Sequence, residues 1–337
     1  MSYSQRAERL WNSQHDGDAR QSRDDVSPHP VTFLVGAERS GTTLTRLMLD
    51  GHPELAFRYE FELAVDLVPP GEGWPDLDVY YEYLRTYRFV DPPPHIDRSL
   101  DYPSLVRSFL EQKRRADRKP RVGAVVHRNF DRLLRIWPDA RFVHIVRDPR
   151  DVARSCVGMG WAGHAWSGVA PWIEAEQLWE RVRASLPRQR WITVRYEDLV
   201  HDPKRELGRI CRLVEIDFDD AMLEYPSRST YRAPSPSFTE QWRKKLTPRD
   251  VQLVESRVHD MLAPRGYALS GLPRIEPSPL ERAALRARCR AGRARHAARS
   301  LGVRLWVERA VAHRGGPRAW REHVQRRVDA AINAQLA

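Results

Sequence analysis

Cysteine and long apolar runs are scarce in this chain of 337 residues, and each shortage excludes a class of protein. The three cysteines, Cys156, Cys211 and Cys289, are odd in number and far apart, so they fit neither a disulfide framework nor a paired zinc motif. No run approaches the roughly 18 apolar residues that a membrane span needs, and the polar first 30 residues lack the apolar segment of a secretory signal. Because the hydrophobic content of 41% suffices for an ordinary core, we expect a soluble, cytoplasmic protein.

Lysine is absent from residues 280–337, where arginine is abundant. This stretch contains 14 Arg and 4 acidic residues, so it carries +10 of the chain's net charge of +11, and the rest is nearly balanced. The spacing of Arg among Ala, Leu and Val predicts a basic helical extension, which either contacts an anionic membrane or acidic partner peripherally or is a plain solvated helix. Aromatic residues are few there, only Trp306 and Trp320, so we expect no specific nucleic-acid binding.

The most informative stretch of the chain, residues 31–49, lacks a lysine at the position where a phosphate-binding loop usually has one. Apolar residues 31–35 lead into Gly36-x4-Gly41, and an amphipathic pattern follows. This order predicts a strand, a phosphate-binding loop and a helix, whose amides together form an anion site. A nucleoside triphosphatase has Lys after the second glycine, but this chain has Thr42 there and carries its cation inside the loop, at Arg39. The loop is therefore built for something other than ordinary ATP hydrolysis.

A second anion-binding pattern follows the predicted strand Arg141–Val146. Arg147 stands at the strand end, Asp148 is a candidate N-cap for the helix that begins at Pro149, and Ser155 lies eight residues after the arginine. Alone, these residues would be read as a surface ion-pair cluster and an ordinary helical serine. Together with the loop, they place a guanidinium and a hydroxyl at the edge of a sheet where ligands of α/β proteins bind.

Predicted strands alternate with predicted helices along the chain. The strands are expected at residues 31–35, 121–126, 141–146 and 191–196, and the helices at residues 130–136, from Pro149, from Pro203 and from Pro248. This alternation predicts an α/β, P-loop-like three-layer fold, with a central parallel sheet flanked by helices and a C-terminal basic helical extension.

Three segments in this order resemble those of sulfotransferases that use 3′-phosphoadenosine 5′-phosphosulfate (PAPS). Residues 36–43 resemble the 5′-phosphosulfate loop of tyrosylprotein and many bacterial enzymes, residues 142–155 the 3′-phosphate segment, and residues 194–199 a segment whose Tyr packs near adenine. The resemblance covers roughly residues 30–215. It implies donor binding without a metal by Arg39, Ser40, Gly41, Thr42, Thr43, Arg147, Ser155 and Tyr196.

The resemblance also implies catalytic roles. Arg39 would stabilise the leaving group, and Glu60, 21 residues further on, would be the general base, with Glu62 able to take that role and a plain solvated Glu60 as the alternative. Many relatives have a Lys in the region that reads 123–130 here, where His127 or Arg128 would supply the positive group. His127 as a neutral donor, a second base or a structural histidine stays open.

Two further segments are suggestive. The stretch 158–166 combines glycines with Trp161, His164 and Trp166, which suits a sugar or aromatic acceptor, although tryptophans also serve as core. Arg243 and Lys244 stand where relatives close a basic loop over the nucleotide, so they are donor-binding candidates, against a solvated basic turn.

The sequence thus predicts an enzyme that moves a sulfuryl group from PAPS to a hydroxyl or amino acceptor, a carbohydrate or small metabolite, and releases adenosine 3′,5′-bisphosphate. Its expected parts are a flexible leader (1–28), a sulfotransferase domain (29–272) and an Arg-rich helical extension (273–337). The alternatives are a P-loop kinase-like phosphotransferase, and a non-catalytic anion- or nucleic-acid-binding protein that uses the Arg-rich tail.

Overall fold

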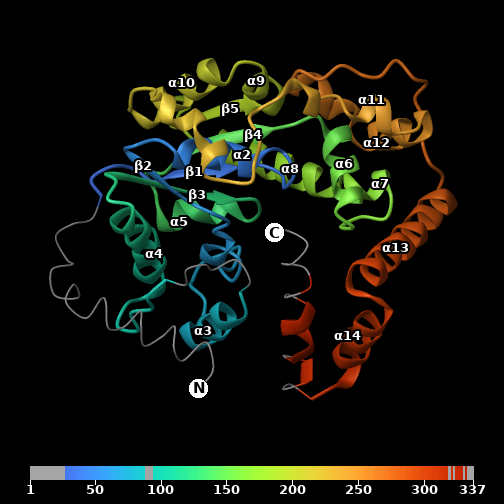
Figure 1. Cartoon of the computed structure of the whole chain (residues 1–337), viewed down its shortest axis with the longest axis horizontal. Helices are drawn as coiled ribbons and strands as arrows, with labels where there is room; N and C mark the ends of the chain where they lie inside the picture. The colour runs from blue at the N-terminus through green and yellow to red at the C-terminus, as the bar shows by residue number, and fades with distance from the viewer. Residues whose placement is uncertain (1–26, 88–93, 318–319, 322, 329–330, 332–337) are drawn as a thin grey trace.

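A five-stranded parallel sheet forms the centre of the computed structural model, which describes residues 27–87, 94–317, 320–321, 323–328 and 331 (Figure 1). The strand order is β2-β3-β1-β4-β5. The strands are β1 (Thr32–Val35), β2 (Leu55–Arg58), β3 (Arg121–Val126), β4 (Arg141–Val146) and β5 (Trp191–Arg195). The predicted fold class is confirmed, whereas nearly all of the predicted leader lies outside the described residues.

Helices follow the strands and cover the sheet (Figure 1). The α-helices are α2 (Thr42–Asp50), α3 (Leu77–Thr86), α4 (Tyr102–Ala116), α5 (Leu133–Ile136), α6 (Pro149–Gly158), α7 (Ala165–Gly168), α8 (Ala170–Ala184), α9 (Tyr196–His201), α10 (Pro203–Val214), α11 (Trp242–Lys245), α12 (Pro248–Leu262), α13 (Pro279–Leu301) and α14 (Val303–Gly315). The short 3₁₀ turns are η1 (Glu62–Ala64), η2 (Phe130–Arg132), η3 (Arg188–Arg190), η4 (Asp220–Leu223), η5 (Tyr225–Ser227), η6 (Pro236–Phe238) and η7 (Ala263–Arg265).

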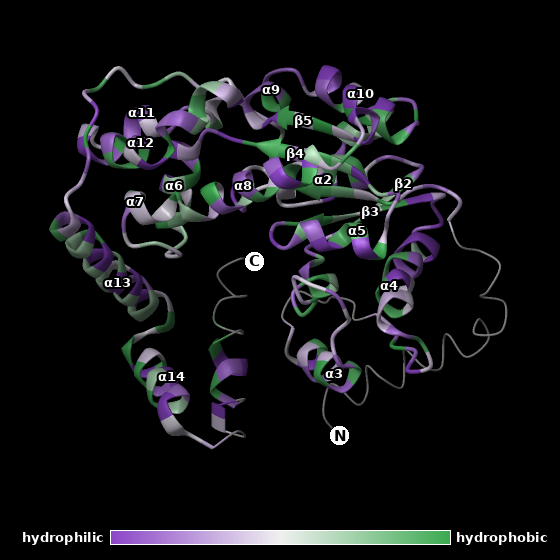
Figure 2. Ribbon diagram, turned by 180° about the vertical axis from the view of Figure 1, so that it is seen from behind, coloured by the Kyte–Doolittle hydropathy of each residue, from purple (hydrophilic) through white to green (hydrophobic). Residues whose placement is uncertain are grey.

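Both faces of the sheet are buried, which explains why its strands read as apolar runs. Successive side chains of β1 point to opposite faces: Phe33 belongs to a core that includes Phe109 of α4, and Leu34 to one that includes Met48 of α2 and Ile210 of α10. Figure 2 shows the central strands in the green of hydrophobic residues. The two cores hold the strand ends, and therefore the loops that follow them, in fixed positions.

The helix starts predicted at Pro149, Pro203 and Pro248 are confirmed, whereas the helix predicted at residues 130–136 is a 3₁₀ turn followed by α5. The side chain of Asp148 accepts a hydrogen bond from the Arg150 backbone and caps α6, and Thr247 caps α12 in the same way from Asp250. The strand predicted at residues 191–196 ends one residue early, because Tyr196 already begins α9.

The topology brings the loops that follow several strands to one edge of the sheet. β1 lies between β3 and β4, and its last residue, Val35, is level with Val126 on one side and His144 on the other. The connections that leave the carboxyl ends of these strands therefore meet at the point where the strand order reverses, which is where open α/β sheets bind ligands.

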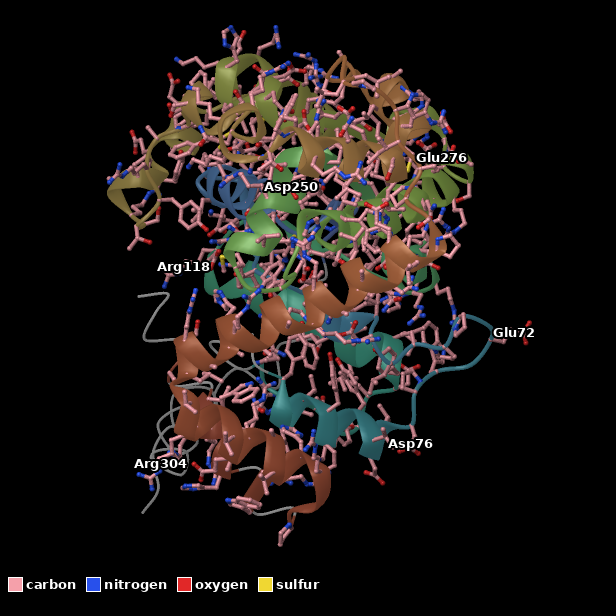
Figure 3. The ribbon with its side chains drawn as sticks, turned by 90° about the vertical axis from the view of Figure 1, so that its right-hand side faces the viewer. Glu72, Asp76, Arg118, Asp250, Glu276 and Arg304 are labelled. Atoms are coloured by element: carbon pink, nitrogen blue, oxygen red, sulfur yellow. The ribbon has the colours of Figure 1, made fainter. Side chains whose placement is uncertain are left out.

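The C-terminal helices stand apart from the sheet. α13 and α14 extend away from it in Figure 1, and much of their ribbon has the purple of hydrophilic residues in Figure 2. In Figure 3, α13 crosses the side of the molecule, with Glu276 near its first turn and Arg304 on α14 beyond its end. Within the described residues, no helix is both long and apolar enough to cross a membrane.

Candidate active site

The carboxyl edge of the sheet collects one predicted site residue from every strand. Arg39 follows β1, Glu60 follows β2, His127 follows β3, Arg147 follows β4 and Tyr196 follows β5. Parallel strands place all of their carboxyl ends at the same edge. Residues that span more than 150 positions of sequence therefore lie along one edge of the sheet.

The loop after β1 has a backbone that requires its glycines. Gly36 and Gly41 have φ of 145° and 97°. A Cβ on Gly36 would lie 2.2 Å from the Ile145 carbonyl oxygen, and a Cβ on Gly41 would lie 2.3 Å from the Tyr196 ring. Arg39 also adopts the left-handed region, with φ of 69°, which is uncommon for a residue with a side chain. The loop is thus tightly folded against β4 and α9.

Arg39 joins the two predicted anion-binding motifs. Its Nε donates a 3.0 Å hydrogen bond to Oγ of Ser155 on α6, and its guanidinium carbon lies 5.7 Å from the ring centroid of Trp161. Within the described part of the chain, no group accepts a hydrogen bond from its two terminal nitrogens. The Arg39 guanidinium is therefore oriented through Nε, and its terminal nitrogens remain available to an anion.

Arg147 is fixed between the loop and a distant segment. Its terminal nitrogens donate to the carbonyl oxygens of Arg39 at 3.3 Å and of Phe238 at 2.7 Å, and its guanidinium lies 4.3 Å from the Tyr196 ring centroid. Asp151, fully buried one helical turn later, approaches it to 3.6 Å. Burial raises the pKa of the Asp151 carboxyl, and the charge of Arg147 opposes that shift. The sequence places Asp151 only in a possible surface ion-pair cluster, whereas the residue is buried beside Arg147, four residues away on one helix.

The ring of Tyr196 packs against both the phosphate-binding loop and Arg147. Only 6% of its surface is exposed, because Gly41 and Arg147 both contact its ring. The ring therefore supports the loop and the guanidinium together.

The loop hydroxyls have different environments. Ser40 is fully buried, and its Oγ has no hydrogen-bond partner within the described residues. Thr42 Oγ1 lies 3.0 Å from Nε2 of His127, and Thr43 is half-buried at the start of α2. A buried hydroxyl without a partner carries a free-energy cost that a bound ligand would relieve.

A buried chain of hydrogen bonds runs from Glu62 through His127 to Thr42. Glu62 Oε1 lies 2.7 Å from Nδ1 of His127 and also accepts the backbone N–H of His127 at 2.9 Å. Burial opposes charge on both groups, but their mutual hydrogen bond and attraction outweigh it, so the pKa of His127 is raised and that of Glu62 is lowered. Both directions favour an imidazolium paired with a carboxylate.

Glu60 differs from Glu62 in its surroundings. Burial and then the neighbouring charge of Glu62 raise the pKa of Glu60, whose side chain is only partly buried and bonds to Tyr59. Glu62, at 1% exposure, is occupied by His127. Of the two carboxylates, Glu60 is the more exposed one, and its pKa is above the ordinary value.

Arg128 points to a different partner. Its guanidinium donates to both carboxylate oxygens of Asp66, at 2.8 and 2.6 Å, and its side chain is about half exposed. Of the two cations proposed for this region, the structure brings His127, not Arg128, into contact with the phosphate-binding loop.

Arg243 and Lys244 are exposed on α11, and Arg243 pairs with Glu240 at 3.0 Å. Within the described residues, neither side chain contacts residues 36–43. Their neighbour Trp242 is buried, and its backbone N–H donates to Asp151 at 2.7 Å. The segment is thus anchored beside Arg147 through a residue that the sequence analysis did not select.

Among the three residues suggested for the acceptor, Trp161 is 45% exposed and faces Arg39. His164 caps α7 and lies 3.2 Å from Asp250, while the Trp166 carbonyl accepts from Arg257. Only Trp161 is therefore placed beside the loop.

Comparison with known proteins gives an independent result. A family model described as "Sulfotransferase family" matches residues 30–220. Protein-tyrosine sulfotransferase 1 of Danio rerio is 26% identical, covering 71% of this chain and 72% of its own. Omega-hydroxy-beta-dihydromenaquinone-9 sulfotransferase Stf3 of Mycobacterium tuberculosis is 24% identical, covering 57% and 64%. The sulfotransferase domain of the Synechococcus PCC 7002 olefin synthase superposes with a TM-score of 0.47 at 21% identity, covering 71% of this chain and 98% of that one.

Proposed function

The chain belongs to the sulfotransferase family, and on that premise we propose that it moves a sulfuryl group from PAPS to a hydroxyl or amino group of a carbohydrate or small metabolite. The observation that carries this proposal is the hydrogen bond from Arg39 to Ser155. It joins a loop suited to the 5′ end of the donor with a helix suited to its 3′-phosphate. A donor with anionic groups at both ends of one ribose needs two such sites at a fixed separation.

Each part of the donor has residues suited to hold it. Loop amides and hydroxyls would bind the 5′-phosphosulfate, and the unpartnered Ser40 hydroxyl fits that role. Arg147 and Ser155 would bind the 3′-phosphate, with Tyr196 as their support. The donor-binding set that we propose is Arg39, Ser40, Gly41, Thr42, Thr43, Arg147, Ser155 and Tyr196, with Arg243 and Lys244 as outer members.

In the proposed step, the acceptor oxygen forms a bond to sulfur as the bond from sulfur to the 5′-phosphate oxygen breaks. The electron pair stays on that phosphate oxygen, which leaves adenosine 3′,5′-bisphosphate, and the acceptor proton passes to the Glu60 carboxylate. Arg39 offers two terminal donors to the developing charge. The raised pKa of Glu60 brings its proton affinity closer to neutral pH, which favours a general base.

His127 acts in this proposal as the positive group that many relatives supply with Lys. As an imidazolium it donates Nδ1–H to Glu62 and Nε2–H to Thr42. Because it touches the loop through Thr42, it is a positioning residue that orients the Thr42 hydroxyl toward the donor.

The acceptor would lie beside Trp161, whose exposed ring suits a sugar or an aromatic group. The relatives named for protein tyrosine and for an omega-hydroxy menaquinone support a hydroxyl acceptor. We also propose residues 29–272 as the catalytic domain and 273–337 as an extension, since α13 begins only at Pro279 after an irregular stretch.

A transfer assay with sulfur-35-labelled PAPS tests the function. The purified protein is incubated with a panel of neutral and acidic hydroxyl and amino compounds, with Arg39→Ala as the blank. We expect label in an acceptor together with an equal amount of adenosine 3′,5′-bisphosphate. Transfer of phosphorus-32 from ATP with Mg²⁺, without sulfur-35 transfer, would instead establish the kinase-like alternative.

A further inference from the structure

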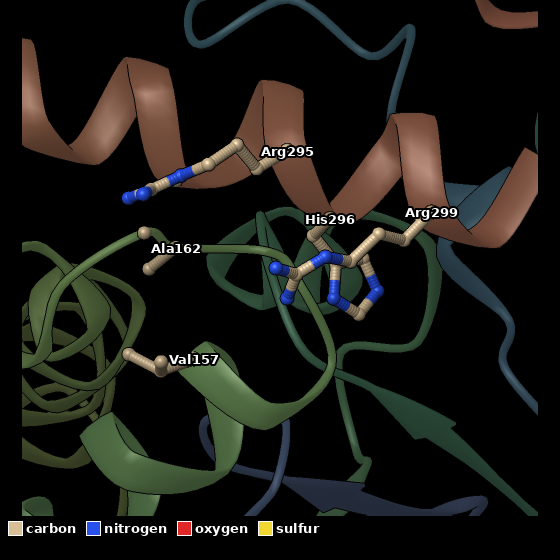
Figure 4. A pocket seen from close by; sticks show the side chains of 7 residues that line it. Val157, Ala162, Arg295, His296 and Arg299 are labelled. Carbon is tan, nitrogen blue, oxygen red and sulfur yellow. The ribbon is translucent and has the colours of Figure 1, made fainter. Parts of the chain in front are cut away.

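A cavity of about 350 Å³ lies between α13 and the connection from α6 to α7. Arg295, His296 and Arg299 of α13 form one wall, and Val157 and Ala162 lie on the other (Figure 4). In Figure 4 the three side chains of α13 extend toward the facing segment. The cavity thus has cationic and imidazole groups on one side and small apolar groups on the other.

Close glycine contacts fix the distance between the two walls. A Cβ on Gly292 of α13 would lie 2.5 Å from Gly163 Cα, and a Cβ on Gly160 would lie 2.0 Å from the His296 ring. The Gly163 N–H also donates to Cys289 Sγ at 3.3 Å. Because a larger side chain at these glycines would clash, they allow α13 to pack closely against the connection from α6 to α7 and to form one wall of the cavity.

The positive groups of the cavity lack counter-charges. Among the described residues, no carboxylate pairs with Arg295, His296 or Arg299, whereas Glu281 at the start of the same helix pairs with Arg249. Two guanidinium groups one helical turn apart repel each other, and guanidinium forks bind carboxylate, phosphate and sulfate groups through paired hydrogen bonds. The arrangement is therefore suited to an anion.

The cavity adjoins the site of the proposed reaction. Val157 lies two residues after Ser155 on α6, and Ala162 follows Trp161, whose ring faces Arg39. α13 lies beyond residue 220, so this wall is outside the part of the chain that matches the family model.

We propose that this cavity binds an anionic group of the acceptor, a carboxylate, phosphate or sulfate, so that the enzyme selects acidic acceptors. The inference rests on the proposed function, because it assumes that the acceptor lies beside Trp161. The donor's phosphates share this chemistry, but Arg39 and Arg147 already face them in the proposed site. An acceptor anchored by Arg295 and Arg299 would present its hydroxyl group toward Arg39.

The test is calorimetric titration of inorganic sulfate into the full-length protein saturated with adenosine 3′,5′-bisphosphate, so that the nucleotide site is filled. The cavity variant is Arg295→Gln/Arg299→Gln. Its matched control is Arg286→Gln/Arg290→Gln, which removes two exposed arginines of α13 at the same spacing that do not line the cavity. We expect saturable sulfate binding that weakens at least tenfold in the cavity variant and less than twofold in the control.

Equal sulfate affinity in all three proteins, or no saturable binding by the wild type, would overturn the proposal. So would a tenfold loss of adenosine 3′,5′-bisphosphate affinity in the cavity variant, because the anion would then belong to the donor. If the wild type does not bind the nucleotide at all, the proposed function fails, and the same titration without nucleotide still decides whether Arg295 and Arg299 form an anion site.

Discussion

The hydroxyl of Thr42, at the first turn of α2, lies 3.0 Å from Nε2 of His127, at the end of β3. This contact connects the phosphate-binding loop to the buried pair formed by His127 and Glu62. The raised pKa of His127 favours the positively charged form of the ring, which lies against the loop. We propose that this His127–Glu62 pair is the counterpart of the Lys in many relatives.

A double-mutant cycle with His127→Asn and Thr42→Val measures this contact. We expect a coupling of about 0.5–3 kcal/mol in transfer rate, as for residues in direct contact. Arg128→Gln is the control, since Arg128 pairs with Asp66 and leaves the loop untouched, and its rate should stay within twofold of wild type. Additive effects of the two substitutions would show that His127 has only a structural role.

The same pair predicts a pH window of stability. The pKa of His127 is raised from 6.5, so its contribution is complete below 6.5 and is lost as pH rises through the raised value. The pKa of Glu62 is lowered from 4.5, so its contribution is complete above 4.5 and is lost as pH falls through the lowered value. Glu62→Gln should lower the free energy of unfolding relative to wild type, and this decrease should be largest between about pH 4.5 and 6.5. Denaturant titration at several pH values measures it. A loss that does not vary with pH would contradict the ion pair.

Replacing Glu60 separates catalysis from binding. Glu60→Gln should lower turnover by about 10²–10⁴-fold, the usual contribution of a general base, and leave the affinity for adenosine 3′,5′-bisphosphate within threefold. Because the pKa of Glu60 is raised in the folded protein, its carboxylate form is destabilising at pH 7, so the variant should melt at an equal or higher temperature. In the wild type, the acid limb of kcat/KM should lie above 4.5. Retained turnover in Glu60→Gln would place the base elsewhere.

Arg147→Ala should weaken the binding of a nucleotide that carries a 3′-phosphate. Loss of a charged hydrogen-bonding group is worth about 1.5–3 kcal/mol, or roughly 10–100-fold in affinity for adenosine 3′,5′-bisphosphate. The affinity for 5′-AMP, which lacks that phosphate, serves as the internal control and should change little. An equal loss for both nucleotides would mean that Arg147 supports the loop and does not read the 3′-phosphate.

Gly41→Ala tests the close packing of the phosphate-binding loop against the Tyr196 ring. The added Cβ meets both a left-handed backbone and the Tyr196 ring, so the free energy of unfolding should fall by about 2–5 kcal/mol. Gly73→Ala is the matched control, since Gly73 also has a positive φ but nothing lies within 4 Å of the added atom, and it should cost about 1–2 kcal/mol. Equal losses, measured by urea unfolding, would contradict the close contact.

Local patterns were enough to predict the strands that carry the two anion-binding motifs, because each combines an apolar run with a distinctive turn or cap. They were not enough for β2, a strand of only four residues at the sheet edge. A short run such as Leu55–Arg58 contains no period that distinguishes it from a loop.

Contacts between distant segments account for what local patterns did not reveal. Asp151 receives the Trp242 N–H from a segment 91 positions away. The approach of Gly292 to Gly163 depends on how α13 returns to the body. Neither contact is encoded in local spacing, so both could be found only in the folded structure.

The measurement that tests the central claim most directly is calorimetric titration of the purified wild-type protein with adenosine 3′,5′-bisphosphate, with 5′-AMP and with ATP in the presence and absence of Mg²⁺. Two anion sites joined by the Arg39–Ser155 bond predict binding of adenosine 3′,5′-bisphosphate at least tenfold tighter than that of 5′-AMP or ATP, independent of Mg²⁺. Equal affinities, no binding of adenosine 3′,5′-bisphosphate, or a preference for ATP with Mg²⁺ would contradict it.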